Sequence, residues 1–334
     1  MTHTGGAHLS AYYTALKQAE EVQQVVLSDP DGKHEQAAKK VLGDKLAKSY
    51  RSHAEMLAAE KPQMALVTME SVLAPPIIEL ALQSGCHVYA EKPACVRTAD
   101  FEKLVQLADS KHKYLMLALA NRIQPPMVAA QKLIRTGKLG KFFGLEMHLV
   151  ADQTRLKQTG YHNSWMADRS RSGGGHLTWL GIHWLDLAMF ITGESINRVA
   201  GFAGVVGGQP IKIEDSAALS FQFSGGSFGT MTSGYYLDRG YHSHMKIWGS
   251  DGWLELDPFQ DVPLKWYSRK EKSPEIQDYS GPKEPKGYTP FVREAVRAAA
   301  GLQEPPISNA DSLRVLKTIF AFYEAAETGQ TQSV

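Results

Sequence analysis

The sequence has few residues that could cross-link a small fold through disulfide bonds or a metal ion. Only two of its 334 residues are cysteines, Cys86 and Cys95, and neither a Cys-x-x-Cys spacing nor a paired Cys/His cluster accompanies them. These absences argue against a disulfide framework and against a structural zinc site, and we predict no metal site. A cytoplasmic protein in a reducing compartment is therefore the expectation.

An excess of charge of one sign and long apolar runs are also missing. The formal net charge is +1, which gives no overall field to attract nucleic acid or an anionic membrane surface. No apolar run reaches the ~18 residues that a membrane span needs, and the N-terminus lacks the pattern of a signal peptide. We therefore expect neither nucleic acid nor a membrane as a partner.

What is present is an ordinary globular composition, with 43% hydrophobic and 21% charged residues, over a length that suits two domains. Residues 1–120 alternate short apolar strands with helices, which predicts a doubly wound parallel α/β sheet. Residues 121–334 carry a series of alternating strands, which predicts a domain with an antiparallel sheet packed on helices.

The strand and loop predictions are specific enough to be tested. Gly225 and Gly226 are interpreted as a two-residue hairpin, residues 257–290 as a long solvated excursion, and residues 311–328 as a final amphipathic helix. The strands are expected at 22–27, 64–68, 87–90 and 114–119, and then at 142–150, 198–202, 216–223, 227–236, 244–248 and 253–256.

Ligands bind beyond the carboxyl ends of the strands in such parallel sheets, so residues at strand ends are site candidates. Asp29 lies about 20 residues after a glycine turn, at the position where a dinucleotide-binding unit carries an acidic residue that binds ribose hydroxyls. The alternative is that Asp29 belongs to a plain turn, since Asp-Pro-Asp-Gly is a good turn sequence. Lys92 precedes Pro93, which favours an extended backbone at a strand tip. The alternative is a surface lysine in a loop.

The stretch from Ser172 to Asp186 is the second informative region. Three consecutive glycines suit a tight turn, and a helical pattern follows that places His183 and Asp186 on one face, with Trp179 four residues before the histidine. The alternative is a buried helix with a core histidine satisfied by Asp186. The aromatic loop before it, with Tyr161 and Trp165, either lines a substrate pocket or forms an exposed or interface segment.

These two segments resemble the signature segments of the Gfo/Idh/MocA family, the glucose-fructose oxidoreductase and inositol dehydrogenase group. The resemblance rests on Gly85 to Pro93 and on the Gly-Gly-Gly-x-x-x-x-x-Gly-x-His-x-x-Asp pattern that ends at Asp186. It implies a Rossmann domain, then a large open and mostly antiparallel sheet that serves as substrate wall and homo-oligomer interface. It also implies NAD- or NADP-dependent oxidation or reduction of a hydroxyl-bearing carbon in a sugar, polyol or related small molecule.

The resemblance also assigns residues. Lys92 matches the lysine that contacts substrate and nicotinamide, and His183 matches the histidine that exchanges the substrate's hydroxyl proton, a task that suits a base with a pKa near neutrality. NAD is favoured over NADP because Asp29 would repel a 2′-phosphate and no arginine follows closely. The other cofactor contacts are Gly5, His8, Thr68, Glu91, Pro93 and Asn121, and the other substrate contacts are Arg122, Tyr161, Trp165 and Trp179.

The chain departs from the family pattern in two places. The first strand is missing, and Thr2 stands where the second fingerprint glycine is expected, so either the chain start is assigned too late or the pyrophosphate site is degraded. Trp179 stands where an aspartate commonly pairs with the histidine, and an indole accepts no proton. A non-catalytic sugar-binding paralogue and a redox-neutral enzyme that retains its cofactor are therefore the alternatives.

Overall fold

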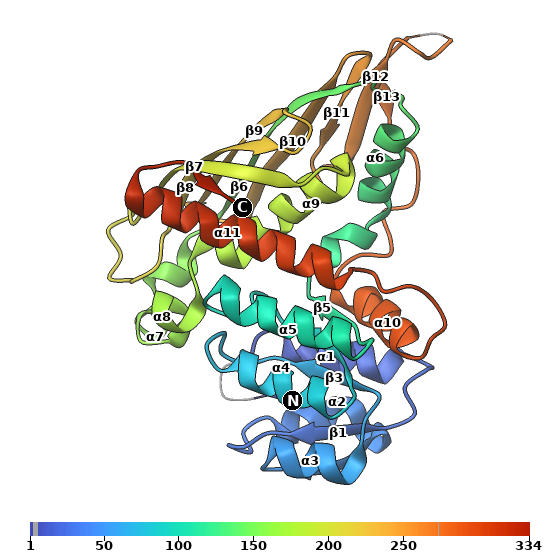
Figure 1. Ribbon diagram of the computed structural model, residues 1–334, viewed down its shortest axis with the longest axis vertical. Coiled ribbons are helices and arrows are strands. Elements are labelled where there is room, and N and C mark those ends of the chain that lie inside the picture. Colours follow the sequence, from blue (N-terminus) through green and yellow to red (C-terminus); the bar gives the residue numbers. More distant parts are fainter. Residues whose placement is uncertain (3–5, 273) are drawn as a thin grey trace. The chain divides into compact units, whose positions relative to one another are not determined.

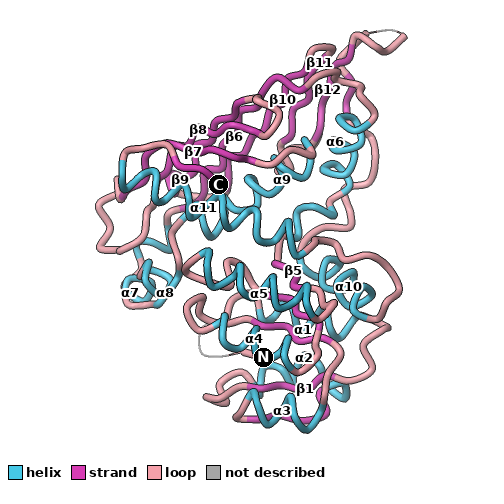
Figure 2. The backbone as a smooth tube through the Cα atoms, viewed as in Figure 1, coloured by secondary structure: helices cyan, strands magenta, loops and turns pink. Residues whose placement is uncertain are grey.

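The chain folds into two compact units. The computed structural model describes residues 1–2, 6–272 and 274–334. The first unit comprises residues 1–120, 170–173 and 286–313, and the second comprises residues 121–169, 174–285 and 314–334 (Figures 1 and 2). A single boundary after residue 120 was predicted, whereas the folded chain returns to the first unit twice.

The first unit contains parallel strands in two separate groups. Strand β1 (Val25–Ser28) pairs with β2 (Leu46–Tyr50), and β3 (Met64–Val67), β4 (His87–Ala90) and β5 (Leu115–Leu117) form a three-stranded sheet. Strand β2 was not anticipated. The parallel pairing and the strand–helix alternation confirm the Rossmann-like prediction, and among the described residues β1 and β3 do not pair with each other.

The helices of the first unit surround these strands. Helix α1 packs against α2 and against α10, a helix that the sequence analysis did not predict and that comes from near the end of the chain. Ser52 caps α3 by accepting a hydrogen bond from the Glu55 amide. The helices are α1 (Leu9–Gln18), α2 (Glu35–Leu42), α3 (His53–Glu60), α4 (Ala74–Gln83), α5 (Thr98–Ser110) and α10 (Tyr288–Ala299).

The second unit is built on one nine-stranded sheet with the order β13-β12-β11-β10-β6-β9-β8-β7-β14 (Figure 1). The β6–β9 pair is parallel and the other neighbours are antiparallel, which confirms the mostly antiparallel prediction. The strands are β6 (Phe142–Asp152), β7 (Ile196–Gly204), β8 (Ser216–Phe223), β9 (Phe228–Leu237), β10 (Tyr241–Gly249), β11 (Gly252–Leu256), β12 (Leu264–Ser268), β13 (Gln277–Asp278) and β14 (Gln332–Ser333).

Two predictions for this sheet need correction. The segment 257–290 is not simply a solvated excursion, because β12 extends the sheet and fully buries Leu264 and Ser268. Its polar composition reflects a strand with a solvated face. The Gly225–Gly226 hairpin is one residue longer than predicted, because the Gly226 amide donates to the Phe223 carbonyl and Phe223 donates to Ser227.

Helices cover one face of the nine-stranded sheet, as Figures 1 and 2 show for α6 (Pro125–Arg135), α9 (Ile182–Thr192) and α11 (Asn309–Thr328), whose first turn belongs to the first unit. Burial along β8 alternates accordingly. Short helical segments lie at 159–162, 165–167 and 169–172, and a π-helix spans Leu177–Gly181. Within the described residues, no helix has the length and apolar character to cross a membrane.

Candidate functional site

The triple-glycine bend in the second unit is shaped by close contacts. A Cβ added at Gly174 would lie 2.1 Å from the Tyr323 hydroxyl oxygen, and one at Gly175 would lie 1.9 Å from the Glu214 carbonyl oxygen. Both distances are far below van der Waals contact. The backbone therefore passes against α11 and against the chain just before β8 with no room for a side chain.

Glu214 organises the start of the helix that carries His183. Its carboxylate accepts hydrogen bonds from the amides of Gly175 (2.7 Å) and Leu177 (3.0 Å) and from the Tyr323 hydroxyl (2.8 Å). Amides in a first helical turn lack partners within their helix, and Glu214 supplies one. Burial raises the pKa of Glu214, and these hydrogen bonds oppose that shift. No role was predicted for Glu214, which lies 39 positions after Gly175 in the chain.

A π-helical turn separates the glycine bend from His183. It spans Leu177–Gly181, and π-turns occur frequently at functional sites. Trp179 lies within it and is buried, and its ring meets the ring of Trp165 edge to face with centroids 5.4 Å apart. His183 follows in the first turn of α9 and is half-buried. Trp165 and Trp179 are therefore brought together in the second unit, as parts of one aromatic wall.

A buried polar cluster lies in the same unit. His176 Nδ1 is 2.6 Å from the Ser233 hydroxyl oxygen, and the imidazole packs edge to face on Tyr235. Burial lowers the pKa of His176 to about 3, so its ring is neutral, and burial raises the pKa of Tyr161 to about 12.

The polar atoms of this cluster are not all satisfied by protein groups. Within the part of the chain that the structure describes, His176 Nε2 and the hydroxyls of Tyr161 and Tyr235 have no hydrogen-bond partner. Buried polar atoms of this kind are usually satisfied by ordered water or by a ligand hydroxyl. His176 and Tyr235 were missed by the sequence analysis, although His176 directly follows the glycine run.

Arg122 has a structural partner. Its guanidinium donates three hydrogen bonds to the Asp186 carboxylate, at 3.0, 2.8 and 2.6 Å, and both side chains are buried. Arg122 was predicted as a substrate ligand, and Asp186 was left open as a residue that satisfies a core histidine. The structure shows Asp186 as the partner of Arg122. Asn121, predicted to contact the cofactor, accepts a hydrogen bond from the Gln124 side chain.

In the first unit, Asp29 lies at the end of β1 and is fully buried. Its Oδ2 accepts a hydrogen bond from the His34 amide (2.7 Å), whereas Oδ1 has no partner within the described residues. An unused carboxylate oxygen at this strand end fits the acceptor that ribose hydroxyls require. Arg51, after β2, contacts the Asp29 carbonyl and pairs with Glu35. An arginine does therefore lie beside Asp29, although it is 22 residues away in the sequence.

The strand end of β3 meets the N-terminal loop. Thr68 donates its hydroxyl to the Ala7 carbonyl (2.8 Å), and a Cβ added at Gly6 would lie 2.7 Å from the Thr68 carbonyl oxygen. The loop is therefore packed closely on this strand end. Gly5, predicted to contact the cofactor, lies outside the described residues.

Charge at this strand end is balanced within the first unit. The buried Glu70 carboxylate, two residues after Thr68, accepts two hydrogen bonds from Arg171, at 2.6 and 2.7 Å. A bidentate pair of this kind neutralises the negative charge.

The end of β4 carries a buried charged group. Glu91 Oε2 lies 3.0 Å from His8 Nδ1 and accepts a hydrogen bond from Tyr12, whereas Glu91 Oε1 has no partner in the described part of the chain. The next residue, Lys92, is only 4% exposed. The alternative of Lys92 as a surface lysine is therefore wrong. No group of three or more His, Cys, Asp or Glu residues arranged to hold a metal ion occurs among the residues described.

Comparison with family models gives two matches. Residues 3–119 match the model described as "Oxidoreductase family, NAD-binding Rossmann fold", and residues 127–255 match the model of the GFO/IDH/MocA C-terminal domain. The two matches together cover most of the chain, in the order that the resemblance predicted.

Among curated proteins, D-apiose dehydrogenase from Paraburkholderia graminis is 25% identical over 324 residues, covering 92% of this chain and 82% of that protein. The chain spans about half the length of other curated relatives that it matches, such as 48% of the dehydrogenase aclE from Aspergillus oryzae, which is 30% identical over 185 residues that cover 54% of this chain.

Solved structures share the fold at low identity. An oxidoreductase domain protein from Kribbella flavida superposes with a TM-score of 0.87 at 22% identity, covering 100% of this chain and 98% of that one. The WlbA dehydrogenase from Bordetella pertussis, whose structure is a complex with NADH and UDP-GlcNAcA, gives 0.84 at 18% identity, covering 100% and 97%.

Proposed function

Because the chain belongs to the GFO/IDH/MocA family of NAD-binding oxidoreductases, we propose that it interconverts a hydroxyl and a carbonyl on a sugar, polyol or related small molecule. The proposal rests on the buried charged residues that follow the strands of the first unit. Asp29 and Glu91 each keep a buried carboxylate oxygen without a protein partner, and Lys92 is buried beside Glu91. Buried charges at a strand end are expensive unless a ligand uses them.

The proposed roles follow from the chemistry of alcohol oxidation. The dinucleotide, when bound, supplies the hydride acceptor. His183 takes the proton from the substrate hydroxyl as the hydride leaves, and the Lys92 ammonium stabilises the developing alkoxide. In the reverse direction the same two groups return the proton and polarise the carbonyl.

For the cofactor we propose NAD rather than NADP. The Asp29 carboxylate is the acceptor for the ribose hydroxyls and would repel a 2′-phosphate. Arg51 could favour NADP, but its guanidinium pairs with Glu35 at 2.7 Å. The test is titration of NADH and NADPH: Glu35→Gln should improve binding of NADPH, and Asp29→Asn should weaken binding of NADH by tenfold or more.

For the substrate we propose a hydroxyl-rich ring. Trp165 and Trp179 supply apolar walls, and the hydroxyls of Tyr161 and Tyr235 remain for hydrogen bonds. A curated relative is named a D-apiose dehydrogenase, which supports this class.

The experiment is a dehydrogenase assay with NAD and a panel of sugars and polyols. His183→Asn should lower kcat by about 10²–10⁴-fold while NADH binding is kept, and Lys92→Met should lower kcat and weaken NADH binding. His112→Asn and Lys111→Met are matched controls, because both residues are exposed on the surface after α5. Equal activity of the His183→Asn variant and the wild type would reject the assignment.

Trp179 favours a second candidate, a non-catalytic sugar-binding protein on the same scaffold. Its indole packs on Trp165 and cannot act as the carboxylate partner of a histidine. If this candidate is right, NADH and sugar bind without turnover and His183→Asn changes nothing. This candidate would be excluded if the wild type turns over substrate and the Trp179→Phe variant does so at a rate within a factor of about ten of it.

We also propose homo-oligomerisation through the sheet of the second unit. Phe143, Phe202 and Phe228, on β6, β7 and β9, are 57%, 81% and 66% exposed. Large exposed apolar side chains on one sheet commonly mark an interface. Sedimentation should show a defined oligomer that Phe202→Lys dissociates.

A further inference from the structure

The second unit holds three buried polar side chains, Tyr161, His176 and Tyr235, which we call the polar cluster. Their exposed fractions are 8%, 0% and 4%. Among the residues that the structure describes, the two tyrosine hydroxyls and His176 Nε2 have no hydrogen-bond partner. A buried polar atom without a partner costs free energy, and a native protein usually satisfies it with water or a ligand. Three such atoms in one unit therefore indicate a place that something polar occupies.

The three side chains line one place. The His176 ring meets the Tyr235 ring edge to face, with centroids 4.5 Å apart. Tyr161 and Tyr235 belong to one group of packed side chains that also includes Ala151. Ala151 lies opposite Tyr235 in the register of β6 and β9. The polar cluster therefore lies where β6 ends and the loop after it begins.

Each unused atom of the polar cluster can donate a hydrogen bond. Burial raises the pKa of Tyr161 to about 12 and raises the pKa of Tyr235 as well, so both hydroxyls keep their protons. Burial lowers the pKa of His176 to about 3, so one ring nitrogen carries a proton and the other does not. When the Ser233 hydroxyl, 2.6 Å from Nδ1, donates to that nitrogen, the proton lies on Nε2. The polar cluster then presents three donors.

A positive charge lies beside these donors. The Arg155 guanidinium is 5.8 Å from the centroid of the Tyr235 ring. After burial, its charge is the next largest influence on the pKa of each of the three residues of the polar cluster. Within the described part of the chain Arg155 forms no ion pair, and its side chain is exposed. A cation that solvent can reach therefore stands beside three buried donors.

Two carboxylates lie within electrostatic range, and both have other partners. Glu214 acts on the two tyrosines, but it already accepts three hydrogen bonds, from two helix amides and one hydroxyl. The side chain and amide of Thr154 lower the pKa of Asp152 more than Arg155 does, and the amide donates to Asp152 at 2.6 Å. Neither acid uses the donors of the polar cluster. Donors beside a cation fit an anion better than a neutral hydroxyl, because charge-assisted hydrogen bonds are the stronger ones.

We propose that the polar cluster and Arg155 bind a carboxylate carried by the substrate, so that the substrate is a sugar acid. The two oxygens of a carboxylate accept about four hydrogen bonds, which matches three donors from the polar cluster and one from the guanidinium. That the ligand is a substrate rests on the proposed oxidoreductase function. The binding of the anion does not.

The test compares sugar acids with neutral partners of the same shape. Calorimetry measures the binding of D-glucuronate and D-galacturonate, each beside its methyl ester, and of D-gluconate beside D-gluconamide. Cofactor is left out, so binding is read without turnover. At least one acid should bind about tenfold more tightly than its neutral partner, because the partner lacks the charge. If every acid binds no better than its partner, the proposal is overturned.

Substitutions locate the binding site. Arg155→Gln should weaken binding of the preferred acid about tenfold and leave binding of its neutral partner within about twofold, and Tyr235→Phe should weaken binding of the acid by a similar factor. Arg135→Gln is the matched control, because Arg135 is exposed in the last turn of α6. Urea unfolding checks that each variant is folded, and the exposed Arg155 keeps the test valid if Tyr235→Phe is not. Equal affinity of Arg155→Gln and Arg135→Gln for the acid would reject the site.

Inorganic phosphate separates a substrate carboxylate from a free anion. Phosphate should compete only weakly with the preferred acid, because it lacks the hydroxyls of the sugar. Phosphate that binds as tightly as the acid, and loses this affinity in Arg155→Gln, would reject the sugar acid and make the site one for a free anion. Turnover of the preferred acid with NAD is measured separately. Tight binding of the acid without turnover would contradict the proposed oxidoreductase function and still support the anion site.

Discussion

The sheets of the two units differ in how their neighbouring strands are connected along the chain. In the second unit, strands that are neighbours in the sheet are mostly neighbours in the chain, as in β7-β8-β9 and β10-β11-β12-β13. In the first unit every parallel pair is joined by a crossover helix. Parallel neighbours need such a crossover connection, whereas antiparallel neighbours can be joined by a short hairpin. Among the described residues, the parallel strands form two separate sheets and the second unit has one continuous sheet.

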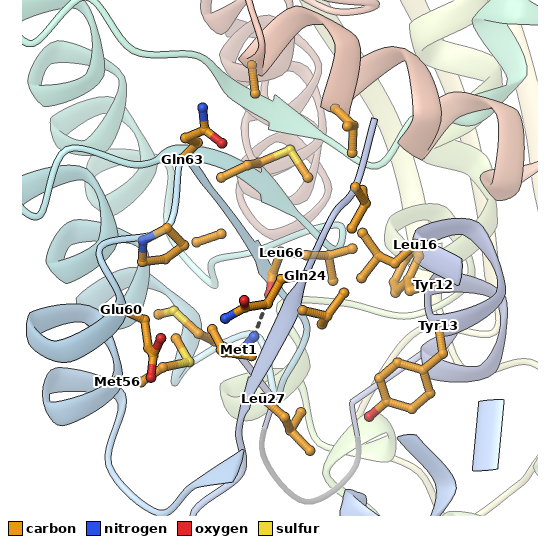
Figure 3. Close-up of a pocket in the computed structure, with 18 of the residues that line it drawn as sticks. Met1, Tyr12, Tyr13, Leu16, Gln24, Leu27, Met56, Glu60, Gln63 and Leu66 are labelled. Carbon is orange, nitrogen blue, oxygen red and sulfur yellow. Dashed lines mark hydrogen bonds between the residues drawn. The ribbon is translucent and has the colours of Figure 1, made fainter. Parts of the chain in front are cut away.

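The units also differ in how they satisfy buried polar groups. In the second unit, carboxylate side chains supply the hydrogen-bond acceptors. Glu214 accepts hydrogen bonds from two helix amides, and Asp186 accepts hydrogen bonds from Arg122. In the first unit, the amino group of Met1 donates a hydrogen bond to the Leu66 carbonyl of β3 (Figure 3). All six tryptophans lie in the second unit, so tryptophan fluorescence reports on that unit alone and each comparison below can be made unit by unit.

The largest effect is expected from Gly175→Ala. The added Cβ would lie 1.9 Å from the Glu214 carbonyl oxygen, which is backbone and cannot move aside. We expect more than about 4 kcal/mol of destabilisation, seen as loss of the folded tryptophan signal in urea unfolding. Gly160→Ala is the matched control, because nothing lies within 4 Å of its added Cβ. Equal midpoints for the two variants would show that the bend is not constrained.

Arg122→Leu should come next. It leaves the buried Asp186 carboxylate without its three hydrogen bonds, and breaking a buried ion pair from one side costs about 3–5 kcal/mol. The double variant Arg122→Leu/Asp186→Leu should recover most of this loss, as measured by urea unfolding followed by tryptophan fluorescence. A double variant as unstable as the single one would mean that the pair contributes through packing.

The pH dependence of the first unit should reveal its buried amine. The Met1 pKa is about 5 in the folded state and 8.0 ordinarily, so below pH 8 the unfolded chain binds a proton that the folded chain does not. Stability is complete above pH 8 and falls by up to about 4 kcal/mol as the pH drops to about 5. Hydrogen exchange of β3 amides measures this change. Nα-acetylated protein should lose that slope, and an unchanged slope would place its cause elsewhere.

The smallest effect is expected from Arg155→Ala. The exposed guanidinium lies 5.8 Å from the centroid of the Tyr235 ring, and an exposed cation–π contact contributes about 0.5–1 kcal/mol. The urea midpoint should therefore shift only slightly. A large shift would indicate that Arg155 holds the buried cluster of Tyr161, His176 and Tyr235 in place.

Patterns that repeat locally were predicted well. The local pattern of apolar residues located β4 and β8 at their observed bounds, because each strand is decided by residues within its own segment. Strand β2 and helix α10 were missed, since their polar faces resemble loops when the packing partner is unknown. The family resemblance found the glycine bend, Lys92 and His183, but not what holds them.

The sequence by itself determined the family and most of the strands and helices, because these depend on residues close together in the chain. Only the tertiary structure decided that Glu214 and Tyr323 close on the glycine bend, that Arg51 lies beside Asp29, and that Arg122 pairs with Asp186. Such contacts join residues 22 to 109 positions apart, where no local pattern carries information about which side chains meet.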